Sequence, residues 1–522
     1  MKWKVLPKKS NDLIKQLLIN RRIKTKEEFE KFFNPNLGDY QKDLSIPGIS
    51  KATERIKKAI KTQELIIAYG DFDVDGIAGA AILYLGLTKM GAKVLPYIPH
   101  REKEGYGLSF VGLDFARDAG ASIVVTTDTG IVAFREAKYA KSLGLDLIIT
   151  DHHEPQGVKR PDAFAIVHSL TLCGAAVAWT LVKDEELLDL VAIATVADMM
   201  PLLGVNRVLV KKGLAKLNLT KRIGLLALFH EAGISLGKIG AYEIGHIIAP
   251  RLNAMGRLEH AIDSLRLLCT KDVNKARRLA SLVGETNTKR QLLTQEAVNE
   301  AKLQIDGKEK IHILTSAAWS PGIIGLVAAR VCEETGKPAI AISLGQEESR
   351  GSARSNGTVN VVEVIRSCSD ILVAVGGHFG AAGFTIATKY LKVFQKRLES
   401  MDLPIDQEER ILEIEAEMPV KELTLELAKN LEDFEPFGIG NQKPILATSN
   451  MQISDLRTVG DNKHLKGKAD GIDFIAFGMG ELINQLVYPE RSQRVNMAYT
   501  LEIDKWDGRE KLQLKVKDIK LN

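Results

Sequence analysis

Acidic residues and histidines follow three short apolar runs in the first third of the sequence. The runs, residues 65–70, 123–127 and 147–150, have the length and composition of buried β-strands. The polar residues after them are Asp71, Asp73 and Asp75, then Asp128, and then His152 and His153. Because ligands bind outside the carboxyl ends of strands in an open parallel sheet, we expect these side chains to converge on one cleft.

Such a cluster needs cations. Carboxylates held close together repel one another, and they stay ionised at neutral pH only when positive charge neutralises them. A further acid, Asp198, follows the apolar helical run 187–197. Carboxylate and imidazole without thiolate suit Mn²⁺ or Mg²⁺. Five or six such ligands are enough for two ions about 4 Å apart, the arrangement that hydrolyses phosphate esters.

Simpler interpretations exist for some of the same residues. Asp71, Asp73 and Asp75 imitate the start of an EF-hand loop, but the twelfth position is Ile82 where that loop needs Glu. Asp128 alone is as well explained as a helix N-cap. The coincidence of several such sites on consecutive strand ends is what favours metal binding.

The elements that position these residues follow from the pattern of the chain. At about 150 residues per domain, 522 residues predict three to four domains. Short apolar strands alternate with helices up to about residue 219, which predicts βαβ units and a parallel sheet. Residues 220–305 are mostly helical, and 272–304 suit a long connector helix. A second α/β block follows, residues 401–410 form a linker, and the tail reads as a small all-β module.

Composition excludes several classes of protein. The chain is 45% hydrophobic and 26% charged, as in globular proteins, and it has no uncharged apolar run of about 18 residues. Its first residues lack the apolar core of a signal peptide. Four scattered cysteines without a Cys-x-x-Cys pair argue against a disulfide framework or zinc ribbon, so we expect a reducing cytoplasm. The net charge of +5 permits a nucleic-acid partner without demanding one.

The strings YGDFDVDG, TTDTG, DHHE and ATVAD, in this order, resemble the DHH phosphoesterase family. The resemblance continues through RLNAMGR, WSPGIIGLVAARV, GSARS, GGHFGAAG and PFGIGNQKP over nearly the whole chain. Short members of the family lack the PFGIGN segment and the β module, so the chain is most similar to the branch of exonucleases specific for single-stranded DNA.

The resemblance implies a division into domains. It predicts an α/β fold with a parallel-sheet DHH domain, a smaller α/β DHH-associated domain joined by a long helix, and a C-terminal OB-fold-like β-barrel. The expected boundaries are an N-terminal extension at 1–60, the catalytic domain at 61–235, a helical connector at 236–305, the substrate-binding domain at 306–402 and the nucleic-acid-binding module at 405–522.

The resemblance also implies an activity and its metal ligands. The chain would be a 5′→3′ exonuclease that uses two Mn²⁺ or Mg²⁺ ions to degrade single-stranded DNA to 5′-mononucleotides in DNA repair and recombination. Asp73 and Asp75 would bind different metals and Asp128 would bridge them. His152 and Asp198 would complete the second site, and Asp71 would ligate or only support the loop. His153 would contact the scissile phosphate or assist the leaving oxygen.

Further residues are implied on the substrate side. The arginines that can clamp phosphates are Arg251, Arg257, Arg350 and Arg354, and the other expected contacts are Arg101, Tyr106, Asn253, Ser352 and His378. An ordinary salt bridge remains the alternative for each arginine. The aromatic residues of the β module that could stack on bases are Phe474, Phe477, Tyr499 and Trp506, although most aromatics of a small barrel are core. His464 and Lys466 would contact the backbone of the strand.

Other functions and partners stay open. One alternative is a DHH phosphodiesterase that acts on short RNA, dinucleotides or nucleoside bisphosphates. Another is a non-catalytic nucleic-acid-binding relative, against which the intact acidic motifs argue. The resemblance implies single-stranded DNA, a helicase and a single-strand-binding protein as partners of a monomer, with no membrane. The chain departs from the family at Ser320, where relatives often have His, and at His168-Ser169, where many have Asn-Pro.

Overall fold

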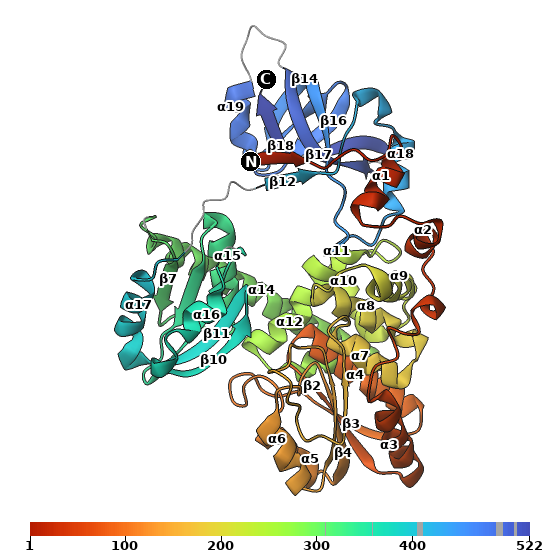
Figure 1. Ribbon diagram of the computed structural model, residues 1–522, viewed down its shortest axis with the longest axis vertical. Coiled ribbons are helices and arrows are strands. Elements are labelled where there is room, and N and C mark those ends of the chain that lie inside the picture. The colour runs from red at the N-terminus through yellow and green to blue at the C-terminus, as the bar shows by residue number, and fades with distance from the viewer. Residues whose placement is uncertain (308, 358, 404–410, 487–493, 506–508, 522) are drawn as a thin grey trace. The chain divides into compact units, whose positions relative to one another are not determined.

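The computed structural model describes residues 1–307, 309–357, 359–403, 411–486, 494–505 and 509–521. By its internal contacts the chain separates into two compact units (Figure 1). Unit 1 comprises Met1–Leu44, Met199–Lys212 and Glu408–Asn522, and unit 2 comprises Ser45–Asp198 and Gly213–Gln407.

Unit 2 begins with a parallel sheet of strand order β3-β2-β4-β5-β6. Its strands are β2 (Leu65–Gly70), β3 (Lys93–Tyr97), β4 (Ala121–Thr127), β5 (Asp146–Asp151) and β6 (Ala165–His168). Its helices are α3 (Ile49–Thr62), α4 (Val74–Lys89), α5 (Phe110–Asp118), α6 (Phe134–Ser142), α7 (Gly174–Val182) and α8 (Leu188–Ala197). The chain leaves β2 toward β3 on one side and β4 on the other, so the strand order reverses between β2 and β4, where ligands of such sheets bind.

Helix α4 packs unusually close to this sheet because it carries glycine where it crosses β4. A Cβ on Gly79 would lie 2.1 Å from the Oγ1 atom of Thr127, the last residue of β4. Most of α4 is buried, and glycine at this position lets the helix approach the strand end. The close approach brings the first turn of α4 beside the residue that follows β4.

A run of helices connects this sheet to the second α/β domain. These are α9 (Gly204–Asn218), α10 (Ile223–Glu231), α11 (Ala241–Glu243), the π-helical turn η3 (Ile244–Ile248), α12 (Ala249–Leu258), α13 (Ile262–Cys269) and α14 (Val273–Leu303). Helix α14 is the long connector expected at 272–304. It starts at a proper N-cap, since the Asp272 carboxylate accepts the backbone N–H of Lys275 at 2.7 Å.

The second α/β domain is built on a mixed sheet of order β10-β11-β9-β8-β7. Its elements are β7 (His312–Ser316), α15 (Ile324–Thr335), β8 (Ala339–Ser343), β9 (Glu348–Arg354), α16 (Val361–Arg366), β10 (Leu372–His378), β11 (Ala381–Ala387) and α17 (Leu391–Glu399). The glycine-rich segment 376–383 spans the turn of the antiparallel hairpin β10–β11. Because β11 also pairs with β9, this hairpin lies next to Ser352 and Arg354.

Unit 1 is a β-barrel in which β14 pairs with both β15 and β17. Its strands are β1 (Lys2–Val5), β12 (Ile411–Ile414), β13 (Ala416–Glu417), β14 (Leu446–Val459), β15 (His464–Ala469), β16 (Ile472–Ala476), β17 (Arg494–Asp504) and β18 (Lys511–Leu521). Its helices are α1 (Leu13–Asn20), α2 (Lys26–Phe33), α18 (Leu425–Glu432) and α19 (Ile483–Leu486), and the part of α9 up to Lys212 also belongs to it.

The first residues of the chain are part of the barrel unit. Strand β1 pairs in parallel with β12, and Leu17 and Phe32 belong to the same buried cluster as Phe434. Both termini accordingly lie in unit 1 (Figure 1). Residues 1–60, expected as one extension, are thus divided: Met1–Leu44 join unit 1, and α3 joins unit 2. Nothing in a short Lys-rich segment signals a pairing that spans about four hundred residues.

The fold class expected from the sequence is confirmed: a parallel-sheet domain, a long helix, a smaller α/β domain and a β-barrel. Most of the linker expected at 401–410 and Trp506, one of the candidate stacking residues, lie outside the described residues. None of the helices among the described residues has the length and apolar character that a membrane crossing requires.

Candidate active site

The acidic and histidine side chains that follow β2, β4 and β5 come together at one edge of the parallel sheet, joined by the residue after α8. Three overlapping groups of side chains each place one ligand atom per residue within 4.8 Å of the others. These groups are Asp71, Asp73 and Asp128; Asp75, His152 and Asp198; and Asp128, His152 and His153. The six residues expected as metal ligands and His153 therefore form one cluster.

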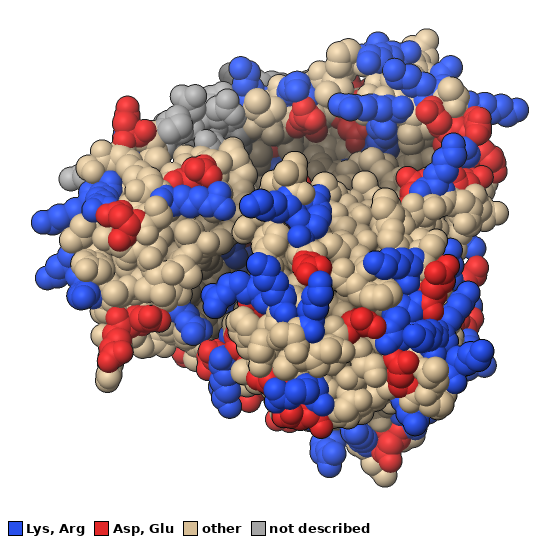
Figure 2. Space-filling model, turned by 60° about the horizontal axis from the view of Figure 1, so that its bottom comes forward, with Lys and Arg blue, Asp and Glu red and all other residues tan. Residues whose placement is uncertain are grey.

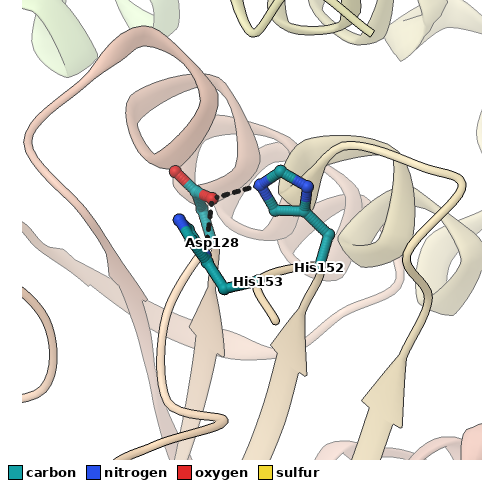
Figure 3. A group of neighbouring side chains, drawn as sticks. All are labelled: Asp128, His152 and His153. Carbon is teal, nitrogen blue, oxygen red and sulfur yellow. Dashed lines mark ion pairs between the residues drawn. The ribbon is translucent and has the colours of Figure 1, made fainter. Parts of the chain in front are cut away.

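Asp128 belongs to two of the three groups, and Figure 3 shows its carboxylate facing His152 and His153. Its Oδ1 atom is 3.1 Å from Nε2 of His152 and 3.7 Å from Nδ1 of His153. The backbone of Asp128 has a φ of 61°, a left-handed conformation that costs energy for a residue with a side chain. The Asp128 N–H donates to the carbonyl of Thr150 at 3.1 Å, which holds this conformation and aims the carboxylate between the two histidines.

Asp75 is held by the start of helix α7. The backbone N–H groups of Gly174 and Ala175 donate to its two carboxylate oxygens at 2.6 and 2.8 Å. A Cβ on Gly174 would lie 2.5 Å from Cβ of Asp128, so only glycine lets the helix terminus come this close. The start of α7 therefore orients Asp75 by hydrogen bonds and restricts the position of Asp128 by van der Waals contact. No local pattern predicts this contact, because it joins segments about a hundred residues apart.

The electrostatics of the cluster fit bound cations. Burial first, and then the neighbouring carboxylates, raise the pKa of Asp71 and of Asp128 well above the usual range. The same causes raise the pKa of Asp198 to about 8. Within the described part of the chain, both carboxylate oxygens of Asp71 and one each of Asp128 and Asp198 are buried without a hydrogen-bond donor. Since buried acids are normally satisfied, these oxygens require a cation.

His153 is fixed by partners on both ring nitrogens. Nδ1 lies 2.9 Å from the Asp151 carboxylate and Nε2 lies 2.8 Å from the Tyr106 hydroxyl. Burial disfavours the charged ring, but the hydrogen bond to Asp151 and its charge outweigh this and raise the pKa of His153 to about 9. Asp151 also accepts the backbone N–H of Ile131 at 2.8 Å. Asp151 was not among the expected site residues, although it opens the DHHE string.

His168, one of the departures from the family pattern, supports the same loop. Its Nε2 lies 2.8 Å from the backbone carbonyl of His153, and the next residue, Ser169, donates its N–H to the carbonyl of Asp151. The residue that replaces Asn in this chain therefore still braces the histidine pair from β6.

Three arginines in unit 2 gather without acidic partners. Arg101 lies over the Phe72 ring, 4.7 Å from its centroid. Burial, followed by the charge of Arg101 and other arginines, lowers the pKa of Arg257 to about 9, and burial followed by the charge of Arg101 lowers the pKa of Arg354. In the described residues, none of the three forms an ion pair with Asp or Glu. Neighbouring guanidinium groups that repel one another favour an anion such as phosphate.

The other expected substrate contacts are placed differently. Ser352 accepts a hydrogen bond from Arg354 at 2.9 Å, and exposed His378 lies on the hairpin beside it. Arg350 is exposed on β9. Arg251, in contrast, is engaged by Glu231 at 3.0 Å and by the carbonyl of Ile247. The Asn253 side chain accepts the N–H of Val74 at 3.0 Å and so anchors the start of α4.

In unit 1, the aromatic residues expected to stack on bases differ in how far they are buried. Phe474 and Tyr499 are fully buried in the barrel core, so they do not stack on bases. Phe477 is 49% exposed, and its ring contacts His464 and the Lys515 ammonium group. Of the candidate aromatic residues that the structure describes, Phe477 is therefore the one whose ring is exposed enough for a base to stack on it.

Surface charge by itself does not mark a nucleic-acid site. On the face drawn in Figure 2, Lys and Arg side chains spread widely, and Asp and Glu side chains lie among them. This mixture agrees with a net charge of only +5. The feature that favours an anionic substrate is therefore the group of unpaired arginines near the acidic cluster.

Comparisons with known proteins place each part of the chain. The model of the DHH family, N-terminal domain, matches residues 65–199, that of the DHHA1 domain matches 308–401, and that of the RecJ OB domain matches 414–518.

Named relatives and solved structures agree with these matches. The chain is 35% identical to the single-stranded-DNA-specific exonuclease RecJ of Bacillus subtilis, over 97% of this chain and 67% of that protein. It is 30% identical to RecJ of Escherichia coli, over 98% and 96% respectively. The crystal structure of RecJ in complex with Mn²⁺ from Thermus thermophilus superposes with a TM-score of 0.86 at 28% identity, covering all of this chain and 80% of that one. The protein described here is thus a member of the RecJ family.

Proposed function

We propose that this chain is an exonuclease specific for single-stranded DNA that depends on two Mn²⁺ or Mg²⁺ ions. One observation carries the proposal: buried carboxylates without donors lie in the same unit as half-buried arginines without acids. The first group suits cations and the second suits a phosphate, which together are what phosphodiester hydrolysis requires.

The ligand atoms divide into two sets. Asp71, Asp73 and Asp128 would hold one cation, and Asp75, His152 and Asp198 would hold the other, with Asp128 between them. Bound there, the cations supply Lewis acidity toward the phosphate and lower the pKa of the attacking water. The chain's own contribution is to keep the carboxylates ionised and oriented, which α7 does for Asp75 through two N–H groups.

His153 is the residue we assign to the leaving oxygen. Asp151 and Tyr106 hold its ring from both sides, and its Nδ1 lies 3.7 Å from Asp128. A proton held at this ring can be given to the departing 3′ oxygen, and Tyr106 keeps the ring from turning away.

The arginine group accounts for the end at which cleavage starts. A terminal phosphate monoester carries nearly two negative charges and an internal diester carries one, so three unpaired arginines favour the terminal group. We assign Arg101, Arg257 and Arg354, with Ser352, to the 5′-phosphate of the strand. Binding of that end would release 5′-mononucleotides in the 5′→3′ direction.

The barrel unit would hold the rest of the strand. Its exposed Phe477, beside His464 and Lys515, offers a stacking surface with adjacent positive charge. We further propose that the protein acts as a monomer in DNA repair and recombination, with a helicase and a single-strand-binding protein, in the cytoplasm. Free cysteines throughout the described chain are compatible with that reducing compartment.

Oligonucleotides labelled at either end test this function. With Mn²⁺ or Mg²⁺, we expect a 5′ label to be released as a mononucleotide at once, a 3′ label to be released last, and duplex or chelated samples to be inert. Faster hydrolysis of dinucleotides than of long strands would instead favour the alternative DHH phosphodiesterase.

A substitution in the barrel tests whether this unit binds the DNA strand. Phe477→Ala should weaken binding of long single strands about tenfold, since stacking on one aromatic ring contributes roughly 1–3 kcal/mol. Hydrolysis of short oligonucleotides should stay unchanged, and Phe115→Ala, an exposed aromatic on α5, is the matched control. Equal affinity of the variant and the parent for long strands would remove Phe477 from the DNA-binding surface.

A further inference from the structure

A cavity of about 500 Å³ lies in unit 2, away from the metal ligands. It is formed where the last turns of α4 and the first turn of α8 meet the segments that precede α10 and follow α13. Its volume falls within the range of about 300–1,000 Å³ that is typical of small-molecule sites. The proposed exonuclease mechanism makes no use of it.

The cavity is a separate site. Leu85 of α4 lines it, ten residues beyond Asp75, so the two positions are about 15 Å apart at 1.5 Å per helical residue. Asp189 lines it at the start of α8, whose other end leads to Asp198. A ligand in this cavity therefore does not touch the residues of the metal cluster.

One wall of the cavity is apolar. Leu85, Ile223 and Leu268 contribute side chains to it, and Cys269 lies next to them, half-buried. Such a wall suits the flat face of a base or another ring, because most ligand pockets combine apolar walls with a few placed polar groups.

The lining of the cavity also includes basic residues. Of its basic residues, Arg222 donates from Nε and Nη2 to the two carboxylate oxygens of Asp189 at 3.0 and 3.1 Å, and Lys216 is bound by Glu186. Lys221 and Lys271 remain, and neither has an ion pair in the part of the chain that the structure describes. The acids of the cavity are thus neutralised, and two positive charges are left for a ligand.

Two hydroxyl groups add directed donors. The Thr220 oxygen accepts the N–H of Arg222 at 3.1 Å, and the Thr270 oxygen accepts the N–H of Asp272 at 3.2 Å. Each oxygen is fixed by its own turn while its O–H proton stays available. Paired with Lys221 and Lys271, the next residues in the chain, these hydroxyls form two similar Thr-Lys contacts for the oxygens of an anion.

We propose that this cavity binds a nucleoside 5′-monophosphate, with the phosphate at Lys221, Lys271 and the two threonines and the base against the apolar wall. The choice of a nucleotide over other anions with an apolar body rests on the proposed function, because the exonuclease would release this compound at every turnover. Binding at a second site would let the enzyme respond to its own product.

The test measures protection of Cys269 in the full-length protein. Cys269 is half-buried, and the other three cysteines are buried, so a small thiol reagent such as methyl methanethiolsulfonate reports on this cavity. Burial raises the pKa of Cys269 to about 12, so the reaction is run at mildly alkaline pH and followed by mass spectrometry of the Cys269 peptide. The probes are thymidine 5′-monophosphate, thymidine and inorganic phosphate, without divalent metal.

We expect thymidine 5′-monophosphate to slow the modification at least tenfold at saturation, and thymidine or phosphate alone to slow it far less. The double variant Lys221→Glu and Lys271→Glu should lose this protection and keep the parent rate of DNA hydrolysis. The control, Lys238→Glu with Lys392→Glu, makes the same charge change at exposed lysines elsewhere and should retain protection.

The opposite results would overturn the proposal. Absence of protection by the nucleotide, equal protection by phosphate, or undiminished protection in the Lys221/Lys271 variant would each do so. Failure of the exonuclease assignment has a different signature, since the wild-type protein would then leave labelled DNA intact whatever happens at Cys269.

Discussion

Each unit of the molecule buries charge, and the two do so in opposite ways. In unit 1, Arg207 is 1% exposed, and it donates hydrogen bonds to the carbonyls of Phe32, Phe434 and Glu435. Its guanidinium also lies 3.8 Å from the centroid of the Phe32 ring. In unit 2, the carboxylates of Asp71 and Asp128 are equally buried, yet key oxygens have no donor within the described chain.

The difference separates a structural charge from a functional one. A buried charge whose hydrogen bonds are all made within the protein fixes the fold, and its pKa can still shift, as that of Arg207 falls to about 10 through burial. A buried charge without partners destabilises the protein until a ligand arrives. Burial alone does not identify a site, but burial without a partner does.

The largest effect is expected at the centre of the acidic cluster. Asp128→Asn should lower the rate of DNA hydrolysis about a thousandfold or more, because this carboxylate belongs to one set of ligand atoms and lies 3.1 Å from His152 of the other. Without metal, the variant should be at least as stable as the parent, since an unpaired buried charge has been removed. Initial rates on labelled oligonucleotides and thermal melting in chelator measure the two parts. Near-normal hydrolysis would exclude the two-metal arrangement.

In unit 1 we expect a substitution of the buried charge to lower stability and to leave hydrolysis unchanged. Arg207→Met should lower the stability of the protein by about 3 kcal/mol, because three carbonyls lose their donor. Hydrolysis of short oligonucleotides at low temperature should be unaffected. Lys212→Met, a lysine on the same helix, is the control. Denaturant melts that coincide for Arg207→Met and the parent would show that this arginine does not hold unit 1 together.

Arg354 has no acidic partner among the described residues, so we expect its substitution to weaken substrate binding more than folding. Arg354→Ala should raise the KM for 5′-phosphorylated strands by about tenfold or more, and the loss should shrink at high salt as counterion release weakens. Strands with a 5′-hydroxyl should be affected less, because they lack the group that we assign to this residue. Arg354→Lys keeps the charge without the paired donors and should restore only part of the affinity. Equal KM values for the parent and Arg354→Ala would make this arginine structural.

The smallest effect is a pH dependence of the metal-free protein. The pKa of Asp198 is raised from 3.8 to about 8, so the folded state binds the proton more tightly than the unfolded state does. Stability from this group is therefore present at acidic pH and is lost as the pH rises between these values.

Melting curves with and without metal isolate this dependence. Asp198→Asn should remove part of the slope, and Mn²⁺ should stabilise the parent more at pH 8 than at pH 5, because metal binding needs the ionised ligand. A parent slope no steeper than that of the variant would contradict the raised pKa.

The sequence predicted the parts of the site that depend on strand ends. Asp71, Asp128 and His152 meet because parallel strands end at one edge, a rule that needs no tertiary detail. The same reasoning gave the order of domains, since the alternation of strands and helices is a local signal.

Contacts between distant segments could not be predicted in this way. The start of α7 that binds Asp75, and His168 that braces His153, have no periodicity to reveal them. Arg251 and Asn253 stay predictions as substrate contacts, and their engagement by Glu231 and Val74 could not be predicted, because a motif conveys a residue type and not its neighbour. Phe474 could have been assigned to the barrel core from the alternation of β16 alone.

The placement of both chain ends in unit 1 has a consequence for biosynthesis. Leu17, Leu18 and Phe32 leave the ribosome before unit 2 does, and their packing partners on β14 to β18 are translated after it. Unit 2 can therefore fold while those apolar side chains are still exposed to solvent. During that interval the nascent chain exposes an apolar segment to which chaperones can bind. Translation of β14 to β18 then allows this segment to be buried.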